Sequence, residues 1–338
     1  MSGAGEMFDL LVVGAGPTGI AVGAAARRAG FSCRLLDRRG LCGSLQDFPH
    51  DMTFFTTRDK LEIADMPFGI PEDKPNRRQA IAYYQGVARH YHLEVAAGEE
   101  VVGIERQADG SFTVDSRKAA NVPGAGAATR HAARAVVLAQ GYFDRPRQLG
   151  VPGEELPWVS PRYREPWGHF EQSVLVIGAG NSAAETALDL WRHGAQVTLV
   201  HRGGAIKSTV KYWLAPDLEN RIAEGSIAAH FYTRVEAFAA DGRVRLVGPA
   251  GASELAVDAA YVLIGYDPEI ELAARAGVRF SAAESMPSFD AETCESNVPG
   301  LYIAGTLQAG RHTNRLFIEN TRDHAEKVVR HLQTKLPV

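Results

Sequence analysis

The chain has 338 residues, a hydrophobic content of 45% and a formal net charge of −4 at pH 7. This balance argues against a nucleic-acid-binding class, which needs a basic surface to neutralise phosphates. The length and the 34 glycines are typical of a soluble α/β protein with about two or three domains. The sequence predicts no metal site and no nucleic-acid partner.

The three cysteines, Cys33, Cys42 and Cys294, are widely spaced and form no CxxC motif. An odd number of cysteines without a secretory signal favours free thiols in a reducing compartment, so we expect a cytoplasmic protein. The apolar run over residues 10–26 is short for a membrane span, lacks a basic leader and contains Gly-Ala-Gly-Pro. It favours a strand, a turn and a helix, and we expect no membrane partner.

Residues 9–38 (DLLVVGAGPTGIAVGAAARRAGFSCRLLDR) carry the first chemical motif, an apolar strand that enters a turn of GxGxxG spacing and continues as a helix of small residues. In such a unit the first glycine allows the tight turn and the second lets the backbone approach a pyrophosphate. The third permits close packing of the helix on the strand, and the phosphates lie at the positive end of the helix. The predicted cofactor-binding residues of this loop are Gly14, Gly16, Pro17, Thr18 and Gly19.

Residues 173–202 (SVLVIGAGNSAAETALDLWRHGAQVTLVHR) repeat this pattern. An offset of 164 residues maps Gly14 onto Gly178, and the same offset maps Gly30 onto Gly194. The two units therefore align without a gap, which turns a motif that is weak when single into the strongest signal of the chain. The predicted cofactor-binding residues of the second loop are Gly178, Gly180, Asn181, Ser182 and Ala183.

The two units end in residues of different charge. Asp37 is placed to accept hydrogen bonds from ribose hydroxyls, as in the adenosine of FAD. His201 stands at the matching position of the second unit and is followed by Arg202, which suits a 2′-phosphate. A hydrogen bond to a charged group contributes about 1.5–3 kcal/mol, enough to prefer NADP over NAD by roughly tenfold or more. The first unit therefore predicts FAD and the second predicts NADPH.

Two further basic residues are candidates for the same sites. Arg38 follows Asp37 directly and is predicted to bind the first cofactor. Lys207 lies five residues after Arg202 and would add positive charge near the 2′-phosphate, although a solvated surface lysine is an equally good interpretation.

Residues 38–55 form a connection rich in Gly, Ser, Asp and Pro. In a flavin domain such a connection passes the isoalloxazine ring, so its polar and aromatic members are candidate flavin contacts. An ordinary surface loop explains the same composition equally well. The candidates are Ser44, Gln46, Phe48 and His50.

The rest of the chain predicts strands and two helices. Residues 77–92 indicate an amphipathic helix, and residues 99–114 indicate a hairpin that turns at Asp109-Gly110. Buried strands are predicted over residues 135–139, 259–265 and 300–305, and a terminal helix over about 317–332. The cofactor-binding candidates in and at the ends of the predicted strands are Val101, Ala139, Gly141, Gly265 and Gly305.

Two segments are predicted hinges: the proline-rich residues 146–166 and the Tyr266-Asp267-Pro268 stretch. The predicted fold is α/β, with two Rossmann-like dinucleotide-binding domains of parallel sheets and right-handed crossovers, the NADPH domain being inserted into the FAD domain. The predicted boundaries are 1–157 for the first part of the FAD domain, 158–268 for the NADPH domain and 269–338 for the C-terminal part of the FAD domain.

With these elements placed, the whole chain resembles the thioredoxin reductase-type flavoproteins with two dinucleotide-binding domains. Within that group it is most similar to the bacillithiol disulfide reductase-like flavoproteins. The matching stretches are FFTTRDKLEIADMPF (54–68), KPNRRQAIAYYQGVAR (74–89), GYFDRPRQLGVPGEELP (141–157), GAGNSAAETALDL (178–190) and RLFIEN (315–320). The resemblance implies FAD, NADPH, hydride transfer to a small oxidised thiol, and a homodimer.

The chain departs from that family at its cysteines. Relatives often carry a cysteine inside the first glycine loop, where this chain has Thr18, and no CxxC precedes the second loop. Cys42 is the one thiol in a segment expected near the flavin, so it is a candidate redox cysteine, with a bland loop cysteine as the favoured alternative.

Thr306 stands where many members of the wider superfamily place an aspartate on the flavin ribitol, and the resembled subgroup shares its absence. Backbone N–H groups around Gly305, Phe317 and Ile318 are then expected to hold the ribitol and pyrimidine edge. A helix N-terminus near Ile318 would stabilise negative charge on reduced flavin, and Ile318 as helix core is the rival interpretation.

The favoured function is transfer of hydride from NADPH through flavin to a low-molecular-weight disulfide such as bacillithiol disulfide. A ferredoxin or flavodoxin reductase, with a small redox protein as partner, is the enzymatic rival and suits the missing cysteines better. A flavin monooxygenase is disfavoured because no FxGxxxH stretch precedes the second loop. A redox sensor that binds both dinucleotides without turnover is the rival from another class.

Overall fold

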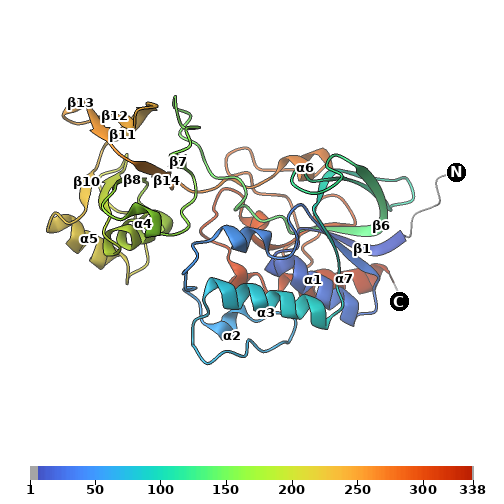
Figure 1. Cartoon of the computed structure of the whole chain (residues 1–338). Coiled ribbons are helices and arrows are strands. Elements are labelled where there is room, and N and C mark those ends of the chain that lie inside the picture. The colour runs from blue at the N-terminus through green and yellow to red at the C-terminus, as the bar shows by residue number, and fades with distance from the viewer. Residues whose placement is uncertain (1–6, 337–338) are drawn as a thin grey trace. The chain divides into compact units, whose positions relative to one another are not determined.

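The structure is a computed structural model that describes residues 7–336, and its contacts divide the chain into two compact units. Unit 1 contains the residues up to Gln46, Met52–Arg145 and the residues from Asp267 onward. Unit 2 contains Asp47–Asp51 and Pro146–Tyr266. Figure 1 shows the sheet and helices of each unit.

Unit 1 is built on a parallel sheet with the order β3-β2-β1-β6-β15. Its strands are β1 (Met7–Val13), β2 (Cys33–Asp37), β3 (Glu94–Ala97), β6 (Ala128–Leu138) and β15 (Leu301–Ile303). Leu10, Leu11 and Val12 at the centre of β1 are fully buried, as expected for a strand covered on both faces. The predicted strands over residues 135–139 and 300–305 correspond to the end of β6 and to β15.

An antiparallel meander extends this sheet. The hairpin partners β4 (Glu99–Arg106) and β5 (Phe112–Lys118) pair with each other, and β5 pairs with the first half of β6. The turn lies at the predicted Asp109-Gly110, where Gly110 has φ +90° and the Asp109 carboxylate accepts hydrogen bonds from the N–H and hydroxyl of Ser111. The predicted hairpin is therefore confirmed.

Helices of unit 1 pack beside the sheet, and α1 (Pro17–Arg28) contacts both α3 (Arg77–His90) and α7 (His324–Lys335). Figure 1 shows these three helices on the same side of the sheet. The capping box of Asn76 and Gln79 explains why α3 begins where it does. Two shorter helices are α2 (Arg58–Leu61) and α6 (Glu271–Arg275).

The terminal helix differs from its prediction over residues 317–332. It begins at His324, and only a 3-10 turn, Ile318–Asn320, lies before it. The Asn320 side chain accepts a hydrogen bond from the N–H of Phe317 and donates one to the carbonyl of Arg315, while the Thr321 hydroxyl donates to the carbonyl of Phe317. These side chains satisfy backbone groups locally and so compete with a continuous helix.

Unit 2 repeats the parallel arrangement with the order β10-β9-β8-β14-β7. Its strands are β7 (Val159–Ser160), β8 (Ser173–Ile177), β9 (Gln196–Val200), β10 (Ala228–His230) and β14 (Ala259–Val262), and its helices are α4 (Asn181–Arg192) and α5 (Ala215–Ala223). A separate antiparallel sheet of β11 (Arg234–Phe238), β12 (Arg243–Gly248) and β13 (Gly251–Ala256) was not predicted. The predicted α/β class with two Rossmann-like parallel sheets is confirmed.

The 164-residue repeat is reproduced hydrogen bond by hydrogen bond. The N–H of Gly14 donates to the carbonyl of Leu36 at 2.9 Å, and the N–H of Gly178 donates to that of Val200 at 3.0 Å. On the other side of each central strand, Ala139 N–H donates to Val13 and Leu263 N–H donates to Ile177, both at 2.8 Å. Gly14, Leu36 and Val13 map onto Gly178, Val200 and Ile177 by the 164-residue offset. The last donors, Ala139 and Leu263, lie only 124 residues apart, because unit 1 has the longer segment of helices and strands before this donor.

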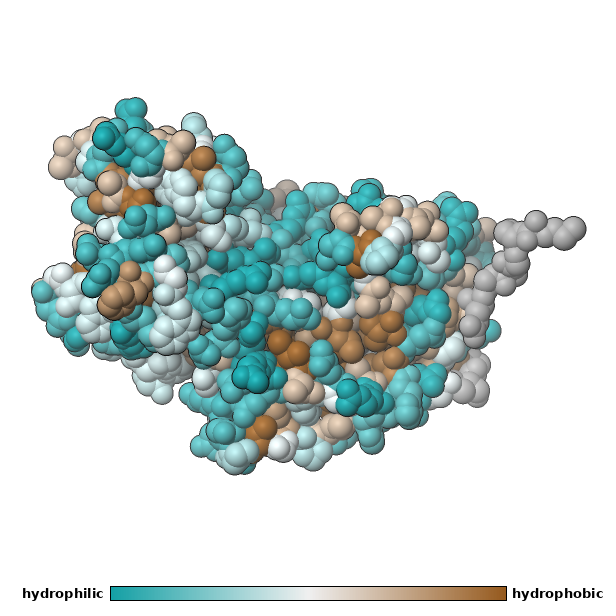
Figure 2. Space-filling model, in the orientation of Figure 1, coloured by the Kyte–Doolittle hydropathy of each residue, from teal (hydrophilic) through white to brown (hydrophobic). Residues whose placement is uncertain are grey.

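The hydrophobic core of each unit lies against its central sheet, around Leu11, Val136 and Ile303 in unit 1 and around Leu175, Val200 and Val262 in unit 2. Figure 2 shows a surface that is largely hydrophilic on this face, with hydrophobic residues in separate small areas. Within residues 7–336 no helix is both long and apolar enough to cross a bilayer.

The packing of the first glycine loop generates a stability prediction. A Cβ at Gly19 would lie far inside contact distance of the Gly14 carbonyl oxygen, whereas a Cβ at Gly16 would have no atom within 4 Å. We expect Gly19→Ala to lower the free energy of unfolding by about 2 kcal/mol or more, because the obstacle is backbone. Gly16→Ala is the control and should change it by less than about 0.5 kcal/mol. Urea denaturation of the protein without added cofactor measures both, and equal stabilities would contradict the packing argument.

Candidate functional site

The first glycine loop offers open backbone at the start of α1. Gly14 has φ +107°, and a Cβ there would meet the Ala139 carbonyl oxygen at 2.5 Å, so only glycine fits. The space beside Gly16 is empty to 4 Å, and no side chain caps the helix that starts at Pro17. Free N–H groups at a helix N-terminus beside an open glycine are the features that a pyrophosphate requires. The loop therefore fits a dinucleotide.

The second loop has the same features, and two hydrogen bonds also hold a neighbouring segment against it. Gly178 has φ +137°, and a Cβ at Gly180 would have no atom within 4 Å. Asn181, the first residue of α4, accepts a hydrogen bond from the N–H of Lys211 at 2.9 Å, and the carbonyl of Ala179 accepts one from the N–H of Lys207 at 3.0 Å. The segment after β9 is thus tied to the loop, next to the exposed Ser182 and the buried Ala183.

The carboxylate of Asp37, which is predicted to bind ribose, accepts hydrogen bonds from three backbone N–H groups. One carboxylate oxygen accepts the N–H of Ala15, and the other accepts the N–H groups of Arg39 and Gly40, all at 2.8 Å. A carboxylate has about four acceptor positions, so roughly one remains for a ribose hydroxyl. Sequence reasoning missed this second task because its partners are backbone groups.

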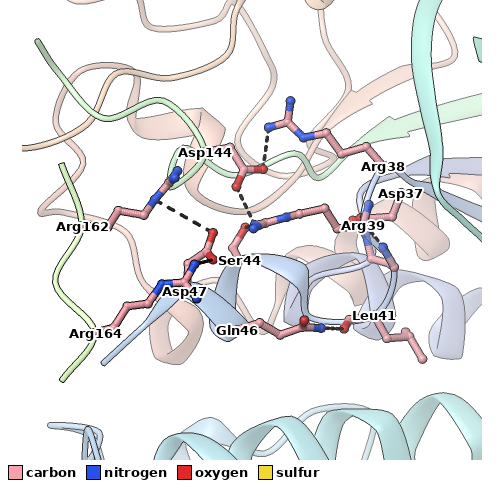
Figure 3. A network of polar contacts seen from close by, with 12 residues as sticks. Asp37, Arg38, Arg39, Leu41, Ser44, Gln46, Asp47, Asp144, Arg162 and Arg164 are labelled. Atoms are coloured by element: carbon pink, nitrogen blue, oxygen red, sulfur yellow. Dashed lines mark hydrogen bonds and ion pairs between the residues drawn. The ribbon is translucent and has the colours of Figure 1, made fainter. Parts of the chain in front are cut away.

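Arg38 and Arg39 share one carboxylate, as Figure 3 shows. Asp144 binds Arg38 through one oxygen and Arg39 through the other, each at 2.6 Å, and Arg39 also donates to the Ser44 hydroxyl at 3.3 Å. Asp144 is a site residue that sequence reasoning missed, because it lies 105 residues from Arg39 in the chain. The pair of arginines next to Asp37 is therefore neutralised in part within unit 1.

The candidate flavin contacts of the 38–55 connection fall in different units. The side chain of Gln46 donates to the carbonyl of Leu41 at 3.4 Å in unit 1. Phe48 and His50 belong to the short segment grouped with unit 2, where His50 pairs with Glu165 at 2.8 Å. In the same segment Asp47 pairs with Arg164 at 3.0 Å, as drawn in Figure 3. Their contact with flavin stays a prediction.

The carboxyl ends of β1, β6 and β15 meet in unit 1. A Cβ at Gly305 would lie 2.9 Å from the Thr18 hydroxyl, and a Cβ at Gly141 would lie 3.8 Å from the Thr306 hydroxyl. The side-chain oxygen of Gln140 is buried there, without a hydrogen-bond partner in the described residues. A buried acceptor without a partner at the carboxyl ends of parallel strands suits a hydroxyl or N–H of a ligand. This end of the sheet therefore also fits a flavin nucleotide.

Two of the three backbone N–H groups expected to hold the ribitol have protein acceptors instead. Gly305 N–H donates to Nδ1 of His324 at 3.0 Å, and Phe317 N–H donates to the Asn320 side chain at 2.7 Å. The expectation that they are available is therefore wrong for this conformation. Ile318 begins the short 3-10 turn, so the helix N-terminus expected there is absent and lies at His324.

The end of β9 is positively charged. His201, the exposed Arg202 and Lys207 lie close enough to interact, and the pKa of His201 is lowered by burial and then by Lys207 and Arg202. No carboxylate is recorded on Arg202 or Lys207 within the described residues, in contrast to the Asp144 that holds Arg38. An uncompensated cationic group beside a phosphate-binding loop fits a 2′-phosphate.

Two predicted strand residues lie in irregular backbone. Val101 is half-buried in β4, where the pairing with β5 shifts register. Gly265 has φ +101° and its carbonyl accepts the N–H of Arg147 at 2.9 Å. Sequence reasoning also passed over Glu185 of α4, whose pKa is raised to about 7, chiefly by burial and then by Asp189.

None of the three cysteines is in an activating environment. Burial raises the pKa of Cys33 and of Cys42 to about 12, and it also raises that of Cys294. Cys42 is fully buried, and the charge that acts on it is the carboxylate of Asp37, which disfavours a thiolate. The candidate redox role of Cys42 therefore has no support in its surroundings.

This burial generates a prediction about thiol chemistry. We expect the folded protein to react very slowly with an aromatic disulfide reagent near pH 8, because the thiolate fraction and the access are both low. All three thiols should react at once in denaturant. Absorbance of the released thiol measures the count, and rapid reaction of one thiol in the folded protein, lost in Cys42→Ser, would show that Cys42 is activated.

Comparison with known proteins places the chain in a family. A family described as pyridine nucleotide-disulphide oxidoreductase matches residues 11–305. The chain is 30% identical over 314 residues to the bacilliredoxin reductase Bdr of Bacillus subtilis (strain 168), covering 93% of this chain and 94% of the relative. It is 23% identical to a ferredoxin–NADP reductase of Ignicoccus hospitalis, covering 89% and 90%.

Among solved structures, the bacillithiol disulfide reductase Bdr (YpdA) from Bacillus cereus superposes with a TM-score of 0.93 at 29% identity, covering 98% of this chain and 100% of that one. The resemblance inferred from the quoted stretches is thereby confirmed. The fold, the paired glycine loops and these matches agree, and the chain belongs to the pyridine nucleotide-disulphide oxidoreductase family.

Proposed function

We propose that this chain is an FAD-dependent oxidoreductase that takes reducing equivalents from NADPH and reduces a low-molecular-weight disulfide of the bacillithiol disulfide class. The observation that carries the proposal is the duplicated glycine loop with an acidic end in unit 1 and a basic end in unit 2. The similarity to the Bdr proteins over nearly the full length supports the choice of substrate.

The residues that hold the two cofactors differ in charge between unit 1 and unit 2. In unit 1 the open backbone at Gly16 receives the pyrophosphate of FAD, Asp37 accepts a ribose hydroxyl, and Gln140 accepts a hydrogen bond from the cofactor. In unit 2 the open backbone at Gly180 receives the pyrophosphate of NADPH, and Arg202 with Lys207 binds its 2′-phosphate. The chemistry that FAD supplies when bound is acceptance of hydride and its onward transfer as electrons.

Further predicted contacts belong to the same proposal. Thr18 and Gly305 border the flavin at the carboxyl end of the sheet. The domain boundaries at residues 157 and 268 stay a prediction, while the contacts of the structure divide the chain after Arg145 and after Tyr266. We also propose a cytoplasmic homodimer, which is supported by the family resemblance and by three buried free cysteines.

A ferredoxin or flavodoxin reductase is the second candidate, and a specific observation favours it. Reduction of a disulfide through an enzyme cysteine needs a reactive thiolate, yet all three cysteines are buried with raised pKa values. An acceptor that takes electrons directly from flavin needs no such thiol, and a ferredoxin–NADP reductase is among the relatives. A redox sensor stays the non-enzymatic alternative.

Electron-acceptor kinetics test these functions. The purified protein is loaded with FAD, reduced with NADPH under anaerobic conditions in a stopped-flow instrument, and mixed with bacillithiol disulfide, ferredoxin, flavodoxin or oxygen. The proposal expects fast flavin bleaching and fast reoxidation by the small disulfide alone. Fast reoxidation by ferredoxin or flavodoxin instead would support the second candidate, slow reduction would support the sensor, and failure to take up FAD would contradict all three.

The basic end of β9 generates a prediction on cofactor choice. Arg202→Ala should raise the KM for NADPH by about tenfold or more, because one charge-assisted hydrogen bond to the phosphate is lost, while the KM for NADH changes little. Arg243→Ala is the matched control, since Arg243 is an exposed arginine of unit 2 that pairs with Asp241 and Glu254. Steady-state kinetics with both nucleotides measure the effect, and equal changes for NADPH and NADH would refute the phosphate contact.

A further inference from the structure

One buried histidine contacts the carboxyl end of the unit 1 sheet, where the flavin site is proposed. His324, the first residue of α7, is only 6% exposed, and its Nδ1 accepts the N–H of Gly305 at 3.0 Å. A ring nitrogen accepts a hydrogen bond only when it carries no proton, so this contact requires neutral His324 with its proton on Nε2. The mechanism so far gives this histidine no task.

The group that His324 holds is the backbone N–H of a glycine turn. Gly305 follows β15 with φ +76°, in the left-handed region, and it packs against the Thr18 side chain of α1. The hydroxyl of the next residue, Thr306, lies beside Gly141 in the segment that follows β6. The hydrogen bond to His324 therefore links α7 to a turn that adjoins both the first glycine loop and the segment after β6.

Burial and the charges around the histidine determine the pH at which this hydrogen bond is present. Asp323 Oδ1 lies 4.0 Å from Nε2, and Lys327 pairs with that same carboxylate at 2.9 Å. Burial lowers the pKa of His324 most, Asp323 raises it and Lys327 lowers it, with a net lowering from 6.5. Since the pKa of His324 in the folded protein lies below the 6.5 of an unperturbed histidine, the neutral form is present at neutral pH. The hydrogen bond is lost as the pH falls through this lowered pKa.

We propose that His324 is a positioning residue of the FAD site, which in its neutral form fixes the Gly305 turn through Nδ1 and so holds the edge against which the flavin lies. The inference rests on the proposed function, in that unit 1 binds FAD. Protonation of His324 removes the acceptor and leaves the Gly305 N–H buried without a partner. FAD binding is therefore weakened by acid through one named side chain.

The experiment compares three variants. His324→Asn keeps an acceptor close to the position of Nδ1 but does not titrate, and His324→Leu removes the acceptor. His331→Asn is the matched control, because His331 lies on the same helix and its Nδ1 contacts the Tyr302 hydroxyl at 3.2 Å, away from Gly305. FAD dissociation constants are measured by flavin fluorescence at about pH 7.5 and at a lower pH, the most acid at which circular dichroism shows each protein to be folded.

We expect the wild type and His331→Asn to lose affinity for FAD by about tenfold or more at the lower pH, as one hydrogen bond is replaced by an unsatisfied group. His324→Asn should bind FAD with wild-type affinity at the higher pH and show no such loss. His324→Leu should be weak at both pH values. Loss of affinity with acid that persists in His324→Asn, or wild-type binding by His324→Leu, would overturn the proposal.

A second readout needs no cofactor. Hydrogen exchange of the Gly305 amide in the protein without FAD should be protected at the higher pH in the wild type and in His324→Asn. After correction for the intrinsic effect of pH, protection should fall with acid in the wild type alone. This measurement tests the hydrogen bond between Gly305 and His324 even if the chain binds no FAD or if His324→Leu fails to fold. Unchanged protection of the wild type at both pH values would refute the proposed role of His324.

Discussion

The structure depends on two places where a strand end passes so close to a neighbouring carbonyl that only glycine fits. Gly14 lies against the carbonyl of Ala139, and Gly178 lies against that of Leu263. Each contact keeps three carboxyl ends of a parallel sheet together, because the same glycine also donates its N–H to the next strand. The open second glycine of each loop then faces outward at the switch point of the sheet, where α/β folds bind ligands.

On this duplicated frame the two nucleotide ends differ in how their charges are balanced. In unit 1, Asp37 is held by three backbone N–H groups and Asp144 neutralises both neighbouring arginines in part. In unit 2 the cationic group after β9 has no carboxylate partner among the described residues, and the pKa of His201 is lowered by burial and then by this group. A 2′-phosphate would gain most from the second arrangement, since a surface arginine already paired with a carboxylate has less to offer an incoming anion.

The burial of all three cysteines limits how this protein could reduce a disulfide. Thr18 occupies the loop position at which the family resemblance implies a cysteine, and its side chain lies next to Gly305. With Cys42 buried beside the carboxylate of Asp37, no thiol of this chain is prepared to attack a disulfide. Any reduction of a disulfide by this protein would therefore proceed without an enzyme thiolate, and this requirement separates the two enzymatic functions proposed above.

The sequence by itself determined the α/β class, the family and the repeat, because glycine spacing and runs of apolar residues are local patterns that dictate local backbone. The hydrogen bonds of Gly14 and Gly178 follow from it residue by residue. The tertiary structure alone decided the partners: Asp144 for Arg38 and Arg39, His324 for the Gly305 N–H, and a terminal helix that begins at His324 and not at 317. Such partners lie far apart in the chain, so no spacing rule encodes them, and packing selects which polar group reaches which.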